Sequence, residues 1–202
     1  NYQPVSPKMQ QDYKQGLAIP DSFQVLLITG GSSGAARINQ AVVNIIDQLL
    51  HDLPELYVIH QVGKDKSYVY GDYEHERLRV LEFLSPMYKY MGSADLVVTR
   101  GSANTIAELG TQGKACIVVP HPELTGGHQV KNAELLSQLG AAVIIEEPKL
   151  ADIQAGLLAT IKRLLADDTE RQRLATALSA NTVAEAAHKL AMLLLETAKP
   201  KE

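Results

Sequence analysis

The stretch ITGGSSGAARIN, residues 28–39, places three glycines and two serines between an apolar run and a helical pattern. Glycine lets the backbone turn sharply and approach a ligand, and a helix start offers unpaired N–H groups to an anion. The residues that could bind phosphate in this way are Gly30, Gly31, Ser32, Ser33 and Gly34. The loop has neither the Walker A pattern nor the G-x-G-x-x-G spacing. Taken alone, it could bind a phosphate or simply form a turn.

A second loop of small residues lies in TRGSANTIAELG, residues 99–110. Gly101, Ser102 and Ala103 would let a ligand approach the start of the next helix. Glu108 lies one turn inside that helix, where its carboxylate could accept hydrogen bonds from both hydroxyls of a ribose. A carboxylate near a helix start also stabilises the helix dipole, so an ordinary structural role stays open.

A third polar stretch, residues 120–136, enters a helix that carries His128, Gln129 and Asn132. Residues three or four apart share a helix face, and amides both donate to and accept from sugar hydroxyls. The alternative is a helix start with solvated polar residues. His121 and His128 have no further ligands at a useful spacing, so we expect no metal site.

Short apolar runs alternate with helical patterns, and this alternation determines where the three loops lie. The predicted strands are 23–29, 56–62, 78–83, 95–99, 115–120 and 141–147, with helices between them at 35–50, 64–76, 86–93, 103–113 and 128–139. Continuous apolar strands are typical of parallel sheets that are buried on both faces. The pattern predicts an α/β fold, a Rossmann-like parallel sheet of about six strands flanked by helices. All three loops follow strands, at the edge where such sheets bind ligands.

We expect three regions along the chain: a polar hinge or linker at 1–22, a Rossmann-like domain at 23–165 and a helical extension at 166–202. Three prolines among the first twenty residues favour the linker. Apolar residues recur at helical spacing after the last strand. They predict helices at 150–165, 168–179 and 182–198.

Composition excludes several classes of protein. Hydrophobic residues make up 46% of the 202 residues and charged residues 21%, as in ordinary globular proteins. A net charge of −4 argues against binding nucleic acid through phosphate neutralisation. No apolar stretch approaches the about 20 residues of a membrane-spanning helix. We expect Cys116, in an apolar run, to be a buried thiol, and His60, at a strand end, to be structural.

Together the motifs resemble the MurG family, the undecaprenyl-diphosphomuramoyl-pentapeptide β-N-acetylglucosaminyltransferases of peptidoglycan synthesis. The motifs are GGSSGAARIN, HQVG, ADLVVTRGSANTIAELGTQGKACIVVPHP and HQVKNAELLSQLGAA, in matching order and spacing. They correspond to the C-terminal half of that family, the donor-sugar domain of a GT-B glycosyltransferase. The resemblance implies binding of UDP-N-acetylglucosamine, the donor of an inverting transfer that converts lipid I to lipid II.

The resemblance also implies roles for individual residues. Ser32 would meet the diphosphate, and the backbone at Leu84 would recognise uracil. The segment that wraps the nucleotide would be Ala103, Asn104, Thr105, Ile106, Ala107 and Glu108. Within it, Thr105 would lie near the phosphates and Glu108 at the ribose.

Gln129 and Asn132 would read the hydroxyls of N-acetylglucosamine. The family's N-terminal half holds the lipid acceptor, the membrane contact on the cytoplasmic face of the inner membrane, and the catalytic base. That half is the implied partner, and neither a metal nor a further cofactor is implied. Two residues depart from the family pattern: Ser6 replaces a hinge arginine, and Asn104 replaces a leucine.

Two alternatives stay open. The chain could be the donor-binding subunit of a two-chain UDP-N-acetylglucosamine transferase, although its start at Asn1 rather than Met favours an excised piece. It could also be a nucleotide-sugar-binding domain that is non-catalytic or has a different chemistry, such as an epimerase relative. A dinucleotide-binding domain is disfavoured, because the strand 56–62 has no acidic residue at its end to hold a ribose.

Overall fold

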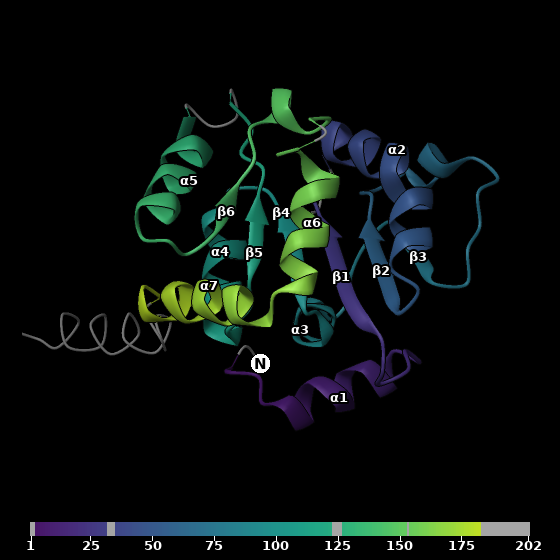
Figure 1. Ribbon diagram of the computed structural model, residues 1–202, viewed down its shortest axis with the longest axis horizontal. Helices are drawn as coiled ribbons and strands as arrows, with labels where there is room; N and C mark the ends of the chain where they lie inside the picture. The colour runs from purple at the N-terminus through teal and green to yellow at the C-terminus, as the bar shows by residue number, and fades with distance from the viewer. Residues whose placement is uncertain (1–2, 32–34, 123–126, 153, 183–202) are drawn as a thin grey trace, which may run out of the picture.

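Among the described residues, six parallel strands form one sheet in the order β3-β2-β1-β4-β5-β6 (Figure 1). The computed structural model describes residues 3–31, 35–122, 127–152 and 154–182. The strands are β1 Gln24–Thr29, β2 Leu56–Gln61, β3 Leu78–Leu81, β4 Leu96–Thr99, β5 Cys116–Val118 and β6 Val143–Ile144. The predicted fold, a Rossmann-like parallel sheet of about six strands, is confirmed.

Helices cover both faces of the sheet. They are α1 Pro7–Gly16, α2 Ala36–Asp52, α3 Met87–Ser93, α4 Ala103–Gln112, α5 His128–Gln138, α6 Leu157–Ala166 and α7 Asp168–Ala180. Short 3-10 turns are η1 Ser67–Tyr70 and η3 Glu147–Lys149. No helix among the described residues is long and apolar enough to cross a membrane.

Strand β1 shows why the apolar runs are continuous. Leu26 and Ile28 pack in a core cluster with residues of α2 and α6, on one face of the sheet. Val25 and Leu27 pack in a second cluster with residues of α3, α4 and α5, on the other face. Successive strand residues point to opposite faces, so a strand covered on both sides needs apolar residues at every position.

The helix predicted at 64–76 is wrong, because this segment forms only the short turn η1. Asp65 and Gly71, on either side of the turn, have φ angles of 56° and 54°. A right-handed helix does not accommodate positive φ, so neither residue can extend the turn.

The helix predicted from residue 150 begins later, at Leu157. The Asp152 carboxylate accepts the N–H groups of Gln154 and Ala155 at 2.8 and 2.7 Å. These bonds close a local turn that competes with the helix. Most of the helix predicted at 182–198 lies outside the described residues.

The segment 1–22, predicted as a linker, contains the helix α1. Ser6 caps it by accepting the N–H of Met9 at 3.3 Å, and Pro7 occupies its first turn. Proline at this position favours a helix, because the missing N–H would have had no intrahelical partner. The prolines therefore mark the start of a helix as well as breaks in the chain.

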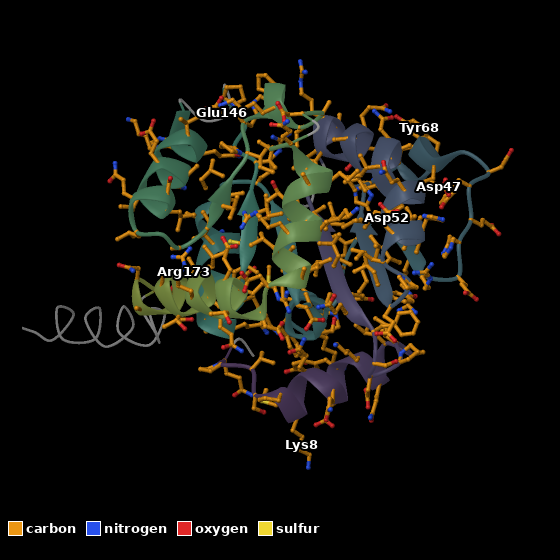
Figure 2. All side chains as sticks on the ribbon, in the orientation of Figure 1. Lys8, Asp47, Asp52, Tyr68, Glu146 and Arg173 are labelled. Atoms are coloured by element: carbon orange, nitrogen blue, oxygen red, sulfur yellow. The ribbon has the colours of Figure 1, made fainter. Side chains whose placement is uncertain are left out.

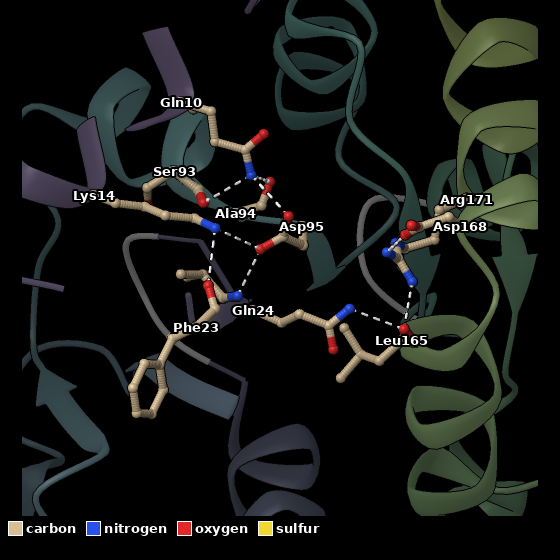
Figure 3. Close-up of polar contacts among 12 residues, drawn as sticks. Gln10, Lys14, Phe23, Gln24, Ser93, Ala94, Asp95, Leu165, Asp168 and Arg171 are labelled. Carbon is tan, nitrogen blue, oxygen red and sulfur yellow. Dashed lines mark hydrogen bonds and ion pairs between the residues drawn. The ribbon is translucent and has the colours of Figure 1, made fainter. Parts of the chain in front are cut away.

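Asp95 attaches α1 to the amino-terminal end of the sheet (Figure 3). Its carboxylate accepts the amide of Gln10 at 2.8 Å and the backbone N–H of Val25 at 2.7 Å, and pairs with Lys14 at 3.2 Å. Lys8 on α1 and Glu146 beside η3 lie at opposite ends of the molecule (Figure 2). Thus α1 braces the edge opposite the carboxyl ends of the strands.

We expect Asp95→Ala to lower the free energy of unfolding by about 2–4 kcal/mol, because it leaves the Val25 N–H without its acceptor and the buried Lys14 without its carboxylate. Urea unfolding monitored by circular dichroism measures this change. Asp72→Ala, at an exposed position, is the matched control and should stay within about 0.5 kcal/mol of the wild type. A similar small effect of Asp95→Ala would contradict the bracing role.

Candidate functional site

The carboxyl ends of β1 and β4 lie side by side, with Thr29 paired to Thr99. From β1 the chain continues through α2 to β2, whereas from β4 it continues through α4 to β5, on the other side. The two loops that leave these strands therefore diverge. A crevice at such a reversal of strand order is where open α/β sheets bind ligands. Gly30 and Gly31 of the predicted glycine loop and the start of α4 lie at this reversal.

Gly31 is held on both sides at the first loop. Its N–H donates to the Thr29 hydroxyl at 3.2 Å, and its carbonyl accepts the Gln61 amide at 3.2 Å. Its φ of 80° favours glycine, as the sequence predicts for a sharp turn. Gly30 is likewise described, whereas the predicted phosphate-binding residues Ser32, Ser33 and Gly34 lie outside the described residues.

The second loop leads directly into α4, and the first turn of this helix contains no acidic residue. Glu108 lies in the second turn, half-buried. The stabilising effect of the dipole falls off within the first turn, which weakens the purely structural interpretation of this carboxylate. Thr105 is half-buried as well, and Ala103, Asn104 and Ala107 are exposed.

Ile106 differs from the other residues of this segment. Its side chain packs against the core cluster on the α3 and α4 face of the sheet. Its N–H donates to the carbonyl of Ser102 at 3.0 Å, as the helix requires. The side chain of Ile106 thus holds α4 on the sheet.

The helix α5 packs directly on the second loop. A Cβ atom at Gly101 would lie 2.7 Å from the carbonyl oxygen of Gln129, so a larger residue would push the helix away. The Asn132 amide donates to the Gly101 carbonyl at 2.9 Å, and the Gln129 side-chain oxygen accepts the His121 N–H at 3.0 Å. The sequence predicts that Gly101 makes room for a ligand, but the structure places α5 there.

Gln129 and Asn132 therefore have a positioning role in this structure. Each holds a backbone group, and each amide has a second hydrogen-bonding group besides the one used. They join the second and third predicted loops into one unit.

Leu84 follows β3 and is 3% exposed, packed in a core cluster. Its side chain therefore faces the core, and recognition of uracil by its backbone stays a prediction. The neighbouring Phe83 is 65% exposed, which sequence analysis does not anticipate. The position of an aromatic residue near the end of a strand is the sequence signal that could have singled out Phe83.

A buried ion pair, also not anticipated, joins the end of β4 to η3. Arg100 Nη1 lies 2.5 Å from Glu147 Oε1, and both side chains are 7% exposed. This oxygen is in contact with the guanidinium but outside hydrogen-bond geometry. Arg37 of α2 lies 3.4 Å from the other Glu147 oxygen, and Arg100 also donates to the Val119 carbonyl at 3.1 Å. Removing one partner of such a pair leaves a buried charge, so the pair fixes the end of β4 relative to η3.

His60 has the structural role that the sequence predicts. Its Nδ1 lies 2.6 Å from the Tyr70 hydroxyl and its Nε2 lies 3.2 Å from the Asn39 side-chain oxygen, while the Asn39 amide donates to Val62. Burial lowers the pKa of His60 from 6.5 to about 3. Cys116 is fully buried, and burial raises the pKa of its thiol to about 12. Among the described residues, no three His, Cys, Asp or Glu side chains form a group that could hold a metal ion.

Residues 25–190 match the family described as Glycosyltransferase family 28 C-terminal domain. The chain belongs to this glycosyltransferase family. The UDP-N-acetylglucosamine--N-acetylmuramyl-(pentapeptide) pyrophosphoryl-undecaprenol N-acetylglucosamine transferase of Salinibacter ruber is 37% identical over 89% of this chain and 48% of that protein. The protein of the same name from Sorangium cellulosum is 34% identical over 86% of this chain and 44% of its own length.

Among solved structures, that of Acinetobacter baumannii MurG is similar, with a TM-score of 0.74 and 28% identity. The match covers 95% of this chain and 54% of that chain. The predicted resemblance to the MurG family and to the C-terminal half of the GT-B fold is confirmed. The family 28 domain described here spans about half the length of these relatives.

The buried histidine predicts how stability depends on pH. The folded protein keeps His60 neutral down to about pH 3, whereas the unfolded chain protonates it near 6.5. Between these values the unfolded state binds the extra proton, so lowering the pH lowers the free energy of unfolding. We expect His60 to contribute up to about 1.4 kcal/mol per pH unit to this slope.

Urea unfolding at about pH 7 and pH 5 measures the slope. His60→Gln should make it shallower. Equal slopes for the wild type and His60→Gln would disprove the contribution of His60.

Proposed function

We propose that this chain is the donor-binding half of an inverting N-acetylglucosaminyltransferase and that its ligand is UDP-N-acetylglucosamine. The observation that carries the proposal is the pairing of β1, which leads into Gly30 and Gly31, with β4, whose loop leads into α4 and packs against α5, at one reversal of strand order. Curated relatives with the same family domain are named for transfer of N-acetylglucosamine from its UDP derivative.

We assign the diphosphate to the glycine loop and the start of α2. The residue before this helix, Ala35, has no side-chain group that could satisfy the first N–H groups of the helix. These groups and the helix dipole would offset the negative charge that develops on UDP as the glycosidic bond breaks. Ser32 would add a hydroxyl donor.

The nucleoside and the sugar would lie on either side of the diphosphate. The Leu84 backbone would recognise uracil, the carboxylate of Glu108 would accept from the ribose hydroxyls, and Thr105 would lie near the phosphates. Gln129 and Asn132, which already position the loops, would offer their second amide groups to the sugar.

Turnover would require a second half. An acceptor domain, on the same polypeptide or on a separate subunit, would supply the lipid-linked muramoyl-pentapeptide and the base that deprotonates its hydroxyl. That assembly would work at the cytoplasmic face of the membrane, with neither a metal nor a further cofactor. This chain alone would bind the donor without transferring it.

Isothermal calorimetry of this chain with UDP-N-acetylglucosamine, UDP-glucose and NAD tests the proposal. We expect UDP-N-acetylglucosamine to bind and NAD to give no heat, because β2 carries Gln61, not an acidic residue, at its end. Failure of both UDP-sugars to bind would refute the proposal.

Glu108→Ala tests the ribose assignment. Loss of two hydrogen bonds to a carboxylate should weaken UDP binding by about ten- to a hundredfold. Glu134→Ala, at an exposed position on α5, is the matched control. Unchanged UDP affinity in Glu108→Ala would show that another group binds the ribose.

A further inference from the structure

Gln61 is the last residue of β2 and is 3% exposed. Its strand lies between β1 and β3, so its side chain reaches the ends of both neighbours. A buried amide at a strand end is costly unless all its groups are paired. The structure pairs them with three different partners.

The side-chain oxygen of Gln61 accepts the Thr29 hydroxyl at 2.5 Å. Its amide nitrogen donates to the carbonyl of Gly31 at 3.2 Å and to the carbonyl of Glu82 at 3.4 Å. The Thr29 oxygen in turn accepts the N–H of Gly31 at 3.2 Å. One amide therefore links the loop after β1 to the loop after β3.

These bonds lie beyond the ladder that holds the strands. The strands are already in register through the pairs Thr29–Gln61 and Gln61–Leu81, which are backbone pairings. Loss of the amide would leave these pairings in place. It would release the positive-φ turn at Gly31 and the segment that leads to Leu84.

We propose that Gln61 is a positioning residue that sets the separation of the two loops, so that one ligand can place its diphosphate on the loop after β1 and its base on the loop after β3. The inference rests on the proposed function, which assigns uracil to the loop at Leu84 and the diphosphate to the loop at Gly31. Because Gln61 is buried, it acts through these loops and not by touching the ligand.

A positioning role predicts unequal losses of affinity for two ligands, whereas a purely structural role predicts equal losses. A ligand that contacts one loop can bind whatever the distance between the loops. When the link is lost, a ligand that spans both loops must order them on binding, and this lowers its affinity. The affinity for UDP should therefore fall more than the affinity for uridine.

The test measures UDP binding by calorimetry and uridine binding by NMR titration, with this chain. Gln61→Met keeps the length of the side chain but removes its hydrogen bonds. We expect it to weaken UDP binding by about tenfold and uridine binding by less than about twofold. Gln48→Met makes the same change at an exposed position of α2 and should leave both affinities unchanged.

Thr29 gives a second, independent variant. Thr29→Val keeps the shape of the side chain but removes the hydroxyl that joins Gln61 to Gly31, and should also lower UDP affinity selectively. Thr29→Ser retains the hydroxyl and should restore the wild-type ratio of UDP to uridine affinity.

Two outcomes would overturn the inference alone: unchanged UDP affinity in Gln61→Met and Thr29→Val, or equal losses for UDP and uridine. Absence of UDP binding by the wild-type chain would instead refute the proposed function, and this inference with it.

Discussion

Backbone pairing between β1 and β4 runs from Leu26–Leu96 to Thr29–Thr99, and the chain leaves this pair in opposite directions. The pair is buried on both faces, so its residues must be apolar until the strands end. At Thr29 and Thr99 this requirement stops, and the loops that follow can carry small and polar residues. Open α/β sheets bind ligands at the carboxyl ends of the strands, where two such loops diverge.

Polar side chains hold the loops that follow the strands. Gln61 joins two of them, Asn132 attaches α5 to another, and the Arg100–Glu147 pair connects β4 to η3. At the amino-terminal edge of the sheet, a buried polar side chain likewise bonds backbone carbonyls. There Lys114 donates to the carbonyls of Gly92 and Ala94, and burial lowers its pKa to about 8.

Sequence patterns predict the strands and most helices because burial on one or both faces requires apolar residues at regular positions. The prediction of a helix at 64–76 is wrong because the apolar spacing does not indicate that Asp65 and Gly71 adopt positive φ. The helix α1 is hidden because proline marks both a break and a first turn. In each case the pattern is ambiguous and the local backbone geometry decides.

The candidate site is predictable only where its residues follow strand ends in the sequence. Gly31 and Glu108 are of this kind. The contact between Gly101 and Gln129 and the Arg100–Glu147 pair join residues far apart along the chain, so no local spacing indicates them. Gly101 illustrates the difficulty, since a glycine needed for close packing of a helix has the same signature as one that admits a ligand.

The end of β2 gives the sharpest contrast with a dinucleotide-binding domain. In that class an acidic residue at this position binds a ribose hydroxyl and must face the ligand. Here the position holds Gln61, turned inward and bonded to Thr29, Gly31 and Glu82. A carboxylate could not donate to the two carbonyls, so the same position cannot both read a ribose and link the loops. Linking the loops at β2 requires that the ribose be bound elsewhere, and α4, on the other side of the reversal, carries the carboxylate proposed for it.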